Sequence, residues 1–519
     1  MRVGIDVGGT NTDAVLMDGR RVVAEVKRPT TADLTSGIVE ALRDLVSQGA
    51  VDVEAVMVGT THFTNAVVEA RRLLPTAAVR LGLPATLGLP PMVDWPQRLR
   101  RALGGHVWLC HGGHEFDGRS LWPLDPDELR RVAAEIGAKG LRSIAVSSVF
   151  SPVNAECEQR AAEIFATQLP GVAISLSHEI GRIGLLEREN ATILNACLRE
   201  VAVTLIGALT AAVAELGITA PLYLSQNDGT LMSAEHAERY PVATFACGPV
   251  NSMRGAGFLS GLPDCAVVDI GGTTCDVGIL RDGFPRQASA AVEIGGVRTN
   301  LRMPDVRSIG LGGGSRVRDG PRPRIGPDSV GYELSRRALV FSGDTLTATD
   351  LAVAGGLAAI GDARQVAGID QDLVRRGLEW IERTVAQAVD RMKTSPRPLP
   401  VVLVGGGSVL IGQRLTGASA LVRPDHFAVA NAVGAAIAQV GGEVDRIVSL
   451  TDQSRDQALA RAKDEAAGMC VAAGASPDSV SIVDVEEVPL AYLPGNATRI
   501  RVKAVGDLDL ERHDHAPGR

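Results

Sequence analysis

The sequence predicts an α/β fold made of two related domains, followed by a small α+β segment. A chain of 519 residues is too long for one ordinary hydrophobic core, so several domains are expected. Apolar strand-like runs alternate with helical patterns along most of the chain, which favours an α/β architecture. One hairpin pattern with two central glycines also occurs twice, at the amino terminus and again past the middle of the chain.

The first half of the chain opens with a predicted β-hairpin over residues 3–20. Val3 to Val7 forms an apolar strand, Gly8 and Gly9 a turn, and Asp13 to Met17 the returning strand. Asp125 followed by Pro126 is typical of a helix start, with an N-cap and a proline at the first helical position. The other elements predicted in this half are helices at 36–48 and 64–72 and strands at 55–58 and 144–149.

The second half begins with a long helical tract over 186–216, which Gly217 ends. The predicted elements that follow are a strand at 222–225, the second hairpin at 266–283, a buried strand leading into three glycines at 401–411, a helix at 453–473, and strands at 480–485 and 500–505. We therefore expect an amino-terminal domain over 1–180, a second domain over 181–444, and a small α+β tail over 445–519.

The two hairpins share the same residues at the same spacing. Asp6, Gly8, Gly9, Thr10 and Asp13 of the first correspond to Asp269, Gly271, Gly272, Thr273 and Asp276 of the second. In both copies apolar strands flank the turn. The separation is too long for the period of a solenoid, so the repeat indicates two related domains that face each other.

Glycine turns of this kind suit a phosphate group. Without a Cβ, the backbone can approach an anion closely and turn its N–H groups toward it. Asp6 and Asp269 end their strands, where each could hold Mg²⁺ through water or orient a nucleophile. The predicted phosphate- and nucleotide-binding residues are Gly8, Gly9, Thr10, Asn11, Thr12, Gly271, Gly272, Thr273, Thr274, Gly405, Gly406 and Gly407.

Two other nucleotide-binding motifs are excluded. A P-loop needs a lysine in the pattern GxxxxGK[ST], and no lysine of this chain lies in such a loop. A dinucleotide fingerprint opens a helix, whereas these glycines join one strand to the next. Phosphate charge would therefore be met by backbone N–H groups, threonine hydroxyls and a cation.

Charge and cysteine content restrict the partners that we expect. The net charge is -8 and the chain has no basic block, so neither nucleic acid nor a membrane surface is an expected partner. The seven cysteines form no CxxC pair and lie mostly within apolar runs, which suits a cytoplasmic protein with buried thiols.

Several stretches together resemble the ATP-dependent hydantoinase/oxoprolinase A-subunit family, within the actin, Hsp70 and sugar-kinase ATPase superfamily. The two hairpins and the late glycine turn are similar to the phosphate and adenosine motifs of that superfamily. The family likeness runs from residue 1 to about 440. It is carried by Gly59-Thr60-Thr61 with Thr64-Asn65-Ala66, Ser177-His178-Glu179, Leu194-Asn195-Ala196, Asp228 to Ser233, Cys247-Gly248-Pro249, Ser308 to Ser315, and Thr347-x-Thr349-Asp350.

The resemblance implies two ribonuclease-H-like domains of the actin-type ATPase fold around an interdomain nucleotide cleft. It implies that ATP, with Mg²⁺, phosphorylates the carbonyl oxygen of a cyclic amide or imide, which water then opens. A B-type or other partner subunit is also implied, and a homo-oligomer stays open. A small-metabolite or sugar kinase and a nucleotide-switched regulatory ATPase are the alternative functions within the superfamily.

The resemblance also suggests where the substrate binds. Polar residues near the glycine-rich turns are the candidates, and His62 is a candidate acid–base residue. Cys247 replaces the serine usual in the family, and without a histidine nearby in the sequence we expect it to pack rather than react. Val58 stands where the family has histidine, and the long members carry a further β-rich domain. The substrate candidates are Thr60, Thr61, Asn65, Asn251, Gly313 and Ser315.

Overall fold

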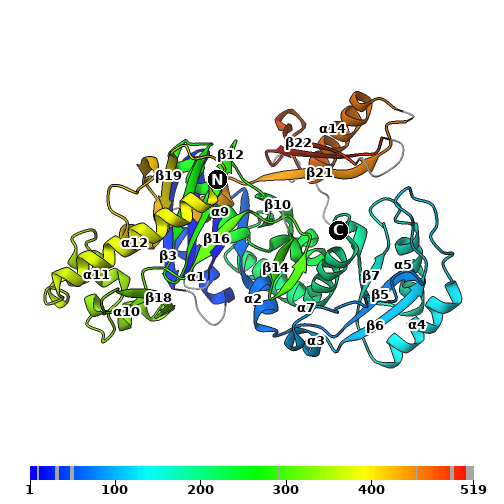
Figure 1. Ribbon diagram of the computed structural model, residues 1–519, viewed down its shortest axis with the longest axis horizontal. Helices are drawn as coiled ribbons and strands as arrows, with labels where there is room; N and C mark the ends of the chain where they lie inside the picture. The colour runs from blue at the N-terminus through cyan, green and yellow to red at the C-terminus, as the bar shows by residue number, and fades with distance from the viewer. Residues whose placement is uncertain are drawn as a thin grey trace.

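The described part of the chain forms three β-sheets of four or more strands, with helices packed between and around them (Figure 1). The computed structural model describes residues 1–8, 11–29, 34–46, 52–288, 291–451, 453–490 and 496–509. Gly9 and Thr10, two of the predicted phosphate-binding residues, lie outside the described residues.

The first sheet begins with the predicted amino-terminal hairpin. β1 and β2 pair antiparallel with Asp6 opposite Asp13, and β1 pairs parallel with β4. The sheet has nine strands in the order β22-β23-β21-β10-β9-β4-β1-β2-β3. Their bounds are β1 Arg2–Val7, β2 Asn11–Asp18, β3 Arg21–Pro29, β4 Ala55–Thr60, β9 Leu222–Ser225, β10 Thr230–Ser233, β21 Gln439–Val448, β22 Ser481–Pro489 and β23 Thr498–Gly506.

The second sheet repeats this arrangement, which confirms the duplication. β11 and β12 pair antiparallel with Asp269 opposite Asp276, and β11 pairs parallel with β19. The order is β13-β12-β11-β19-β20, with β16 on β12. The strands are β11 Cys265–Ile270, β12 Cys275–Arg281, β13 Phe284–Pro285, β16 Val306–Ile309, β19 Leu399–Val404 and β20 Ala418–Val422, with the small pairs β14 Val292–Ile294 with β15 Val297–Thr299 and β17 Ser315–Arg318 with β18 Arg324–Ser329 nearby in the chain.

Two short helices join these two sheets. α13 (Ala430–Ala436) packs on the first sheet against Val15 and Met17, and α9 (Cys247–Ser260) packs on the second sheet through Met253 and Ala256. The helices cross with their backbones in contact. A Cβ added at Gly255 would lie 1.8 Å from Ala430 O, so this crossing requires glycine. The opposite faces are covered by α1 (Leu34–Val46) and α12 (Gln371–Met392).

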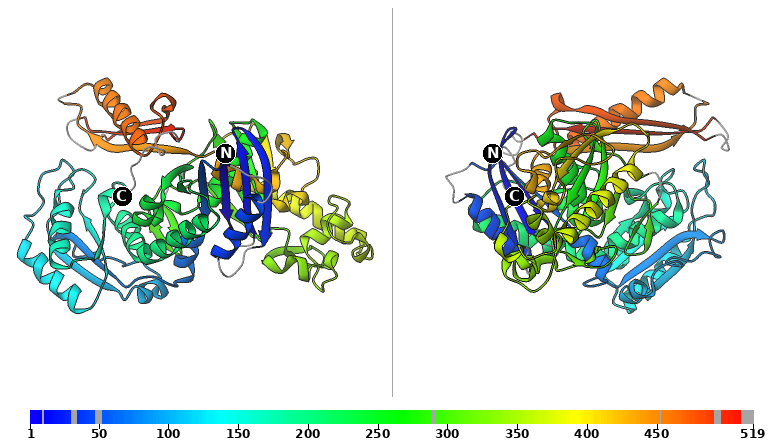
Figure 2. Two further views of the ribbon diagram at one scale, coloured as in Figure 1. Left: turned by 180° about the vertical axis from the view of Figure 1, so that it is seen from behind. Right: turned by 60° about the vertical axis from the view of Figure 1, so that its left-hand side comes forward.

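The stretch of chain between β4 and β9, which pair with each other in the first sheet, forms a third sheet that is fully parallel (Figure 2). Its order is β6-β5-β7-β8, and Asp125 caps α4 by accepting from the N–H groups of Asp127 and Glu128, as predicted. α7 is long and apolar enough to cross a bilayer by composition, but 56% of that stretch is buried against the sheets. The elements are β5 Thr76–Leu83, β6 His106–His111, β7 Ser143–Ser148, β8 Ala173–Leu176, α4 Pro126–Ala138, α5 Glu156–Gln168 and α7 Leu185–Glu215.

The carboxyl-terminal α+β segment continues the first sheet. β21 pairs with β10 at its start and then carries β23 and β22, and α14 (Arg455–Ala472) packs on this extension. The domain ranges 1–180, 181–444 and 445–519 stay predictions, since the first sheet draws strands from all three. The other helices are α2 His62–Glu69, α3 Gln97–Ala102, α6 Ser177–Ile180, α8 Ala234–Arg239, α10 Leu334–Arg337 and α11 Ala348–Ala354.

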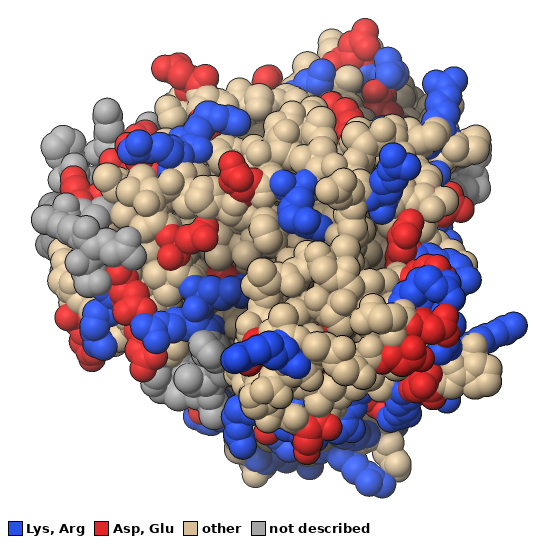
Figure 3. All heavy atoms as spheres, turned by 90° about the vertical axis from the view of Figure 1, so that its left-hand side faces the viewer, with Lys and Arg blue, Asp and Glu red and all other residues tan. Residues whose placement is uncertain are grey.

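Acidic and basic side chains alternate on the face shown in Figure 3. On the described part of this face, no single-sign field of the kind that binds nucleic acid is present. The expectation that nucleic acid is not a partner stays a prediction.

Candidate functional site

The candidate site lies where the two glycine hairpins face each other across α9. Both turns are closed in the same way: the N–H of Gly8 donates to Asn11 O at 3.0 Å, and that of Gly271 donates to Thr274 O at 2.9 Å. Thr12 lies buried in β2, whereas Thr273 is half-buried and Thr274 is exposed at the second turn. The predicted repeat therefore holds at the level of backbone geometry.

Asp6 is buried at the end of β1 and held by two asparagines. Asn251 Nδ2 donates to Asp6 Oδ1 at 3.3 Å, and Asn431 Nδ2 donates to Asp6 Oδ2 at 3.0 Å. Asn431 also donates to Asp13 Oδ2 at 2.9 Å, so it bridges the two carboxylates of the hairpin. The Oδ1 atom of Asn251 is buried and has no hydrogen-bond partner among the residues that the structure describes. Asn251, predicted to contact substrate, thus lies against Asp6.

Asp269 has the matching place in the second hairpin. Its hydrogen-bond partner in α9 is Ser252. Ser252 directly follows Asn251, the partner of Asp6, so successive residues of one helix contact the two aspartates. A glycine faces each carboxylate: a Cβ at Gly59 would lie 2.4 Å from Asp6 Oδ1, and one at Gly405 would lie 2.2 Å from Asp269 Oδ1. Glycine is required at both positions because any side chain would collide with the carboxylate.

The site holds more negative than positive charge. Asp6, Asp13, Asp269 and Asp276 surround it, and Lys27 of β3 is the basic side chain whose charge acts on both Asp6 and Asp269. Lys27 Nζ lies 2.6 Å from Asp13 Oδ1 and donates to Ala428 O at 3.0 Å.

Burial is the largest influence on the pKa values of the two facing aspartates, Asp6 and Asp269. It raises the pKa of Asp6 to about 6, against the opposing hydrogen bond from Asn251. It also raises the pKa of Asp269 to about 6, against the opposing Ser252 hydroxyl, while the charges of Asp276 and Asp6 add to the increase. Burial raises the pKa of Asp276 as well. A cation bound between the hairpins would relieve these unfavourable carboxylate charges.

Replacing Asp269 with asparagine is expected to stabilise the protein when Mg²⁺ and nucleotide are absent. Because its folded-state pKa is raised, protonation favours folding, and this contribution is lost as the pH rises through about 6. The variant should gain about 1–3 kcal/mol at neutral pH. Thermal melts should show the gap between variant and wild type narrowing as the pH falls toward about 5. A gap that is absent, or that widens in acid, would contradict a buried charged carboxylate.

The two later glycine runs pack on the second hairpin. The N–H groups of Gly313 and Gly314 donate to Gly271 O and Gly272 O at 3.0 and 2.7 Å, and a Cβ at Gly407 would lie 2.6 Å from Gly271 O. A Cβ at Gly406 would lie 3.9 Å from Lys27 Cε. The Gly405–Gly407 turn therefore lies between the second glycine hairpin and Lys27, and its contact with a nucleotide stays a prediction.

Ser315 is buried, and its polar groups form hydrogen bonds within its own loop. Its hydroxyl accepts from the N–H of Gly312 at 2.8 Å, and its own N–H donates to Gly312 O. Gly313 O accepts from the N–H and the hydroxyl of Thr349, both at 2.9 Å. These two substrate candidates therefore lie behind the second glycine turn, and their contact with substrate stays a prediction.

Thr60, Thr61 and Asn65 lie beside the first glycine turn. Thr60 pairs with Val7 across β4 and β1, and the Thr61 hydroxyl donates to Val7 O at 3.4 Å. Asn65 is exposed, and its Nδ2 donates to the Thr61 hydroxyl at 3.4 Å. The structure brings these three candidates together next to the first hairpin.

His62 begins α2 directly after these threonines. Its backbone N–H donates to the Thr60 hydroxyl at 3.1 Å. Burial lowers the pKa of His62, so its ring is neutral at neutral pH. A neutral imidazole can accept a proton, and the acid–base role stays a prediction.

Cys247 is buried at the start of α9. Its thiol donates to Thr60 O at 3.3 Å, and burial raises its pKa to about 12. A thiolate is therefore not populated at neutral pH, which agrees with packing as its expected role.

The sequence reasoning missed Lys27 and Asn431. Lys27 lies in β3 and Asn431 at the start of α13, far apart in the chain, and neither belongs to a glycine pattern. In the sequence, Lys27 is one of the lysines that lie outside any P-loop pattern. The signal that could have found it is the scarcity of lysine, because a lone lysine in the strand next to the hairpin must lie close to Asp13.

Comparison with known proteins shows the family to which this chain belongs. A family model described as hydantoinase/oxoprolinase N-terminal region matches residues 2–169, and one described as hydantoinase/oxoprolinase matches residues 188–359. Together they cover well over half of the chain. The chain therefore belongs to the hydantoinase/oxoprolinase family.

Curated relatives are longer than this chain. The caprolactamase subunit alpha of Pseudomonas jessenii is 27% identical over 396 residues, which make up 69% of this chain and 55% of that protein. The acetophenone carboxylase gamma subunit of Aromatoleum aromaticum is 28% identical over 391 residues, covering 68% and 53%. The chain spans about half the length of the curated relatives it matches.

Solved structures confirm the α/β fold class. The crystal structure of ATP-dependent caprolactamase from Pseudomonas jessenii matches with a TM-score of 0.79 at 19% identity, covering 98% of this chain and 88% of that one. The nucleotide-free structure of acetone carboxylase matches with a TM-score of 0.67 at 18% identity over the same shares.

Proposed function

We propose that this chain is an ATP-dependent enzyme subunit that opens a cyclic amide or imide by phosphorylating its carbonyl oxygen. The observation that carries the proposal is the pair of equivalent hairpins that bring Asp6 and Asp269 to one point. Lys27 lies beside them, and the glycine turns of residues 312–314 and 405–407 pack on the turn of the second hairpin at residues 271–272. Family membership and relatives named for ATP-dependent chemistry support it.

The residues present fit a bound Mg²⁺. The four aspartates outnumber the one lysine, and both facing carboxylates have a raised pKa, so a divalent cation would offset buried negative charge. Asp6 and Asp269 would hold it directly or through water. When bound, Mg²⁺ supplies neutralisation of phosphate charge during phosphoryl transfer.

The chain's own residues would place ATP and substrate. The glycine turns would place backbone N–H groups toward the phosphates, and Lys27 Nζ would contact the phosphates from β3. The amino terminus of α9 lies beside Thr61, since a Cβ at Gly248 would lie 3.7 Å from Thr61 Cγ2. A substrate carbonyl held by Thr60, Thr61 and Asn65 would then lie near the first hairpin.

The reaction balances with one ATP for each ring. The carbonyl oxygen attacks the γ-phosphorus, and the bond from that phosphorus to the bridging oxygen breaks, which releases ADP. Water adds to the ring carbon, the carbon–nitrogen bond breaks, and the ring nitrogen takes a proton. A second water releases inorganic phosphate and leaves a carboxylate. His62, neutral at neutral pH, would accept a proton from water.

Phosphorylation suits this substrate class because a lactam is a poor electrophile. Turning its oxygen into a phosphate leaving group couples ring opening to ATP. The relative named caprolactamase supports a cyclic amide. The relatives named acetophenone and acetone carboxylase subunits favour a second candidate, a ketone whose carbonyl oxygen is activated in the same way. A kinase with a stable phosphorylated product and a regulatory ATPase complete the alternatives.

A partner subunit is part of the proposal. The relatives are named as alpha, gamma and beta subunits, which supports assembly with other chains. The assay should therefore use the purified chain alone and with any protein that co-purifies.

The test is incubation with Mg-ATP and a panel of hydantoins, 5-oxoproline, lactams, ketones with bicarbonate, and sugars. Phosphate release that depends on a cyclic amide and accompanies its opening supports the proposal. A stable phosphorylated product would favour the kinase, and turnover stimulated only by a protein would favour the regulatory ATPase. Carboxylation of a ketone would favour the second candidate.

A further inference from the structure

A cavity of about 340 Å³ lies where three parts of the chain meet, and no residue of the candidate ATP site lines it. Arg182 precedes α7 and Glu187 lies in its first turn, Asn300 and Leu301 follow β15, and Arg499 comes from β23 of the carboxyl-terminal extension. Cavities at such junctions are common places for small ligands.

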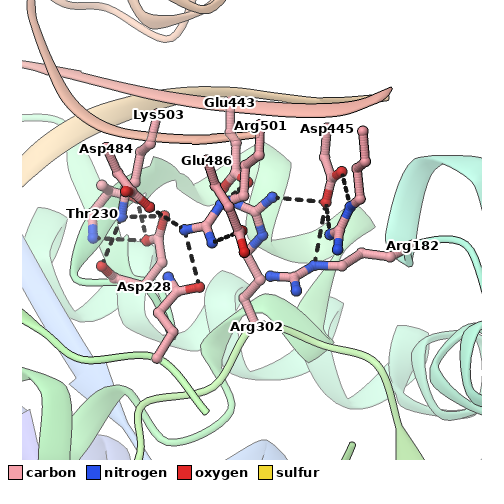
Figure 4. Close-up of polar contacts among 12 residues, drawn as sticks. Arg182, Asp228, Thr230, Arg302, Glu443, Asp445, Asp484, Glu486, Arg501 and Lys503 are labelled. Carbon is pink, nitrogen blue, oxygen red and sulfur yellow. Dashed lines mark hydrogen bonds and ion pairs between the residues drawn. The ribbon is translucent and has the colours of Figure 1, made fainter. Parts of the chain in front are cut away.

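The guanidinium of Arg182 has N–H donors that no described residue accepts. Its Nε lies 3.6 Å from Asp445 Oδ2, beyond hydrogen-bond distance, and its guanidinium makes no hydrogen bond to any residue that the structure describes (Figure 4). Asp445 is already engaged: Arg499 donates to both of its oxygens at 2.8 and 2.6 Å, and Arg302 donates at 3.2 Å. Three arginines therefore contact one carboxylate, and the contact of Arg182 is the longest of the three.

The other side of the cavity offers acceptors. Asn300 Nδ2 donates to the backbone O of Arg182 at 3.0 Å, while its Oδ1 is buried without a hydrogen-bond partner among the described residues. Glu187 lies close by, because a Cβ at Gly184 would lie 3.6 Å from both Asn300 Nδ2 and Glu187 Oε2. Asn300 Oδ1 lies against Gly181, where a Cβ would be 2.6 Å away, so the acceptor that an N–H group in the cavity can reach is the carboxylate of Glu187.

We propose that this cavity binds a small carboxylate that also carries an N–H donor, with the carboxylate on Arg182 and the nitrogen toward Glu187. Leu301 and Ile447 line the space between and suit a short hydrocarbon chain. An ω-amino carboxylate has this pattern. The proposal stands apart from the ATP chemistry, although ω-amino carboxylates are also what the opening of a lactam would release.

The electrostatic environment agrees with this geometry. The pKa of Arg182 is lowered to about 10, mainly by burial; the charge of Asp445 opposes this change, and the charges of Arg501 and Arg499 add to it. Arg501 is paired with Glu443, Asp484 and Glu486, so a bound carboxylate would serve as a closer partner for Arg182 in particular. A bidentate carboxylate is the partner that arginine geometry favours.

The test is calorimetric titration of the full chain with 5-aminopentanoate, without nucleotide or Mg²⁺. We expect saturable binding that Arg182→Gln weakens at least tenfold, while Arg142→Gln, at an exposed arginine paired with Glu200, leaves it unchanged. Pentanoate should bind more weakly than the amino acid, and pentylamine, which lacks the carboxylate, should not bind.

Ala291→Trp provides a second variant that removes no charge. Ala291 is exposed on the cavity wall, so the larger side chain should fill the space without breaking an ion pair and should also abolish binding. If Arg182→Gln fails to fold, this variant decides. The proposal is overturned if the wild type shows no saturable binding, if pentylamine binds equally well, or if the folded cavity variants bind as the wild type does. Because ATP is absent, none of these results bears on the proposed phosphoryl transfer.

Discussion

Asp269→Asn is expected to lower ATP turnover at least ~100-fold while the protein stays folded. The change keeps the volume of the side chain but removes the charge that would hold Mg²⁺ and orient the phosphates. The carboxylate lies at the end of β11, opposite Asp276 and facing Asp6, so no neighbouring residue can take its place without moving a strand. ADP formation at saturating Mg-ATP, with substrate present, measures the effect.

Asp264→Asn is the matched control for this experiment. Asp264 directly precedes the same strand, is exposed, and pairs with Arg281. Its replacement should leave turnover within about twofold, since surface ion pairs contribute little. Near-normal turnover in Asp269→Asn, with melting behaviour that confirms folding, would remove Asp269 from the proposed ATP site.

Lys27→Met is expected to raise the KM for Mg-ATP by about 10- to 100-fold. Lys27 Nζ contacts Asp13 Oδ1 and Ala428 O, and the aliphatic part of its side chain lies beside the turn at Gly406. Methionine keeps the length and the apolar stem, so the loss reports the ammonium charge alone. Direct nucleotide titration should show the same weakening as the kinetics.

Two comparisons separate a phosphate contact from a structural role of Lys27. Lys27→Arg keeps the charge and should recover part of the affinity, while Lys139→Met, at an exposed lysine that ends α4, should change nothing. If Lys27→Met lowers thermal stability but leaves nucleotide affinity unchanged, the lysine only neutralises Asp13.

The sequence allowed the duplicated hairpins to be predicted because their determinants are local. A short apolar run defines each strand, and the glycines define each turn, so the correspondence of Asp6 with Asp269 follows from spacing alone. The capped start of α4 and the long helix α7 were predictable for the same reason.

The contacts that complete the site depend on topology instead. Asn251 reaches Asp6 because α9 crosses α13, where a Cβ at Gly434 would lie 1.8 Å from Asn251 O. Asn431 bridges Asp6 and Asp13 from a helix more than 400 residues along the chain, as the separations of 425 and 418 residues show. No local pattern in the sequence carries such pairings.

Substrate candidates were the least predictable part of the site. Thr60, Thr61 and Asn65 follow β4, so their position beside the first turn comes from strand pairing. Gly313 and Ser315 lie in a glycine-rich loop that suggested substrate binding, but that loop packs on the backbone of the second hairpin. Glycine content alone does not distinguish a turn that faces a ligand from one that faces another turn.

The most direct test of the central claim is the ratio of ADP formed to rings opened, measured in one reaction with a substrate from the cyclic amide panel. The account predicts one ADP and one inorganic phosphate for each opened ring. It also predicts that both products disappear together in Asp269→Asn. Ring opening that continues without ATP, or ADP formation that leaves the phosphoryl group on a stable product, would contradict it.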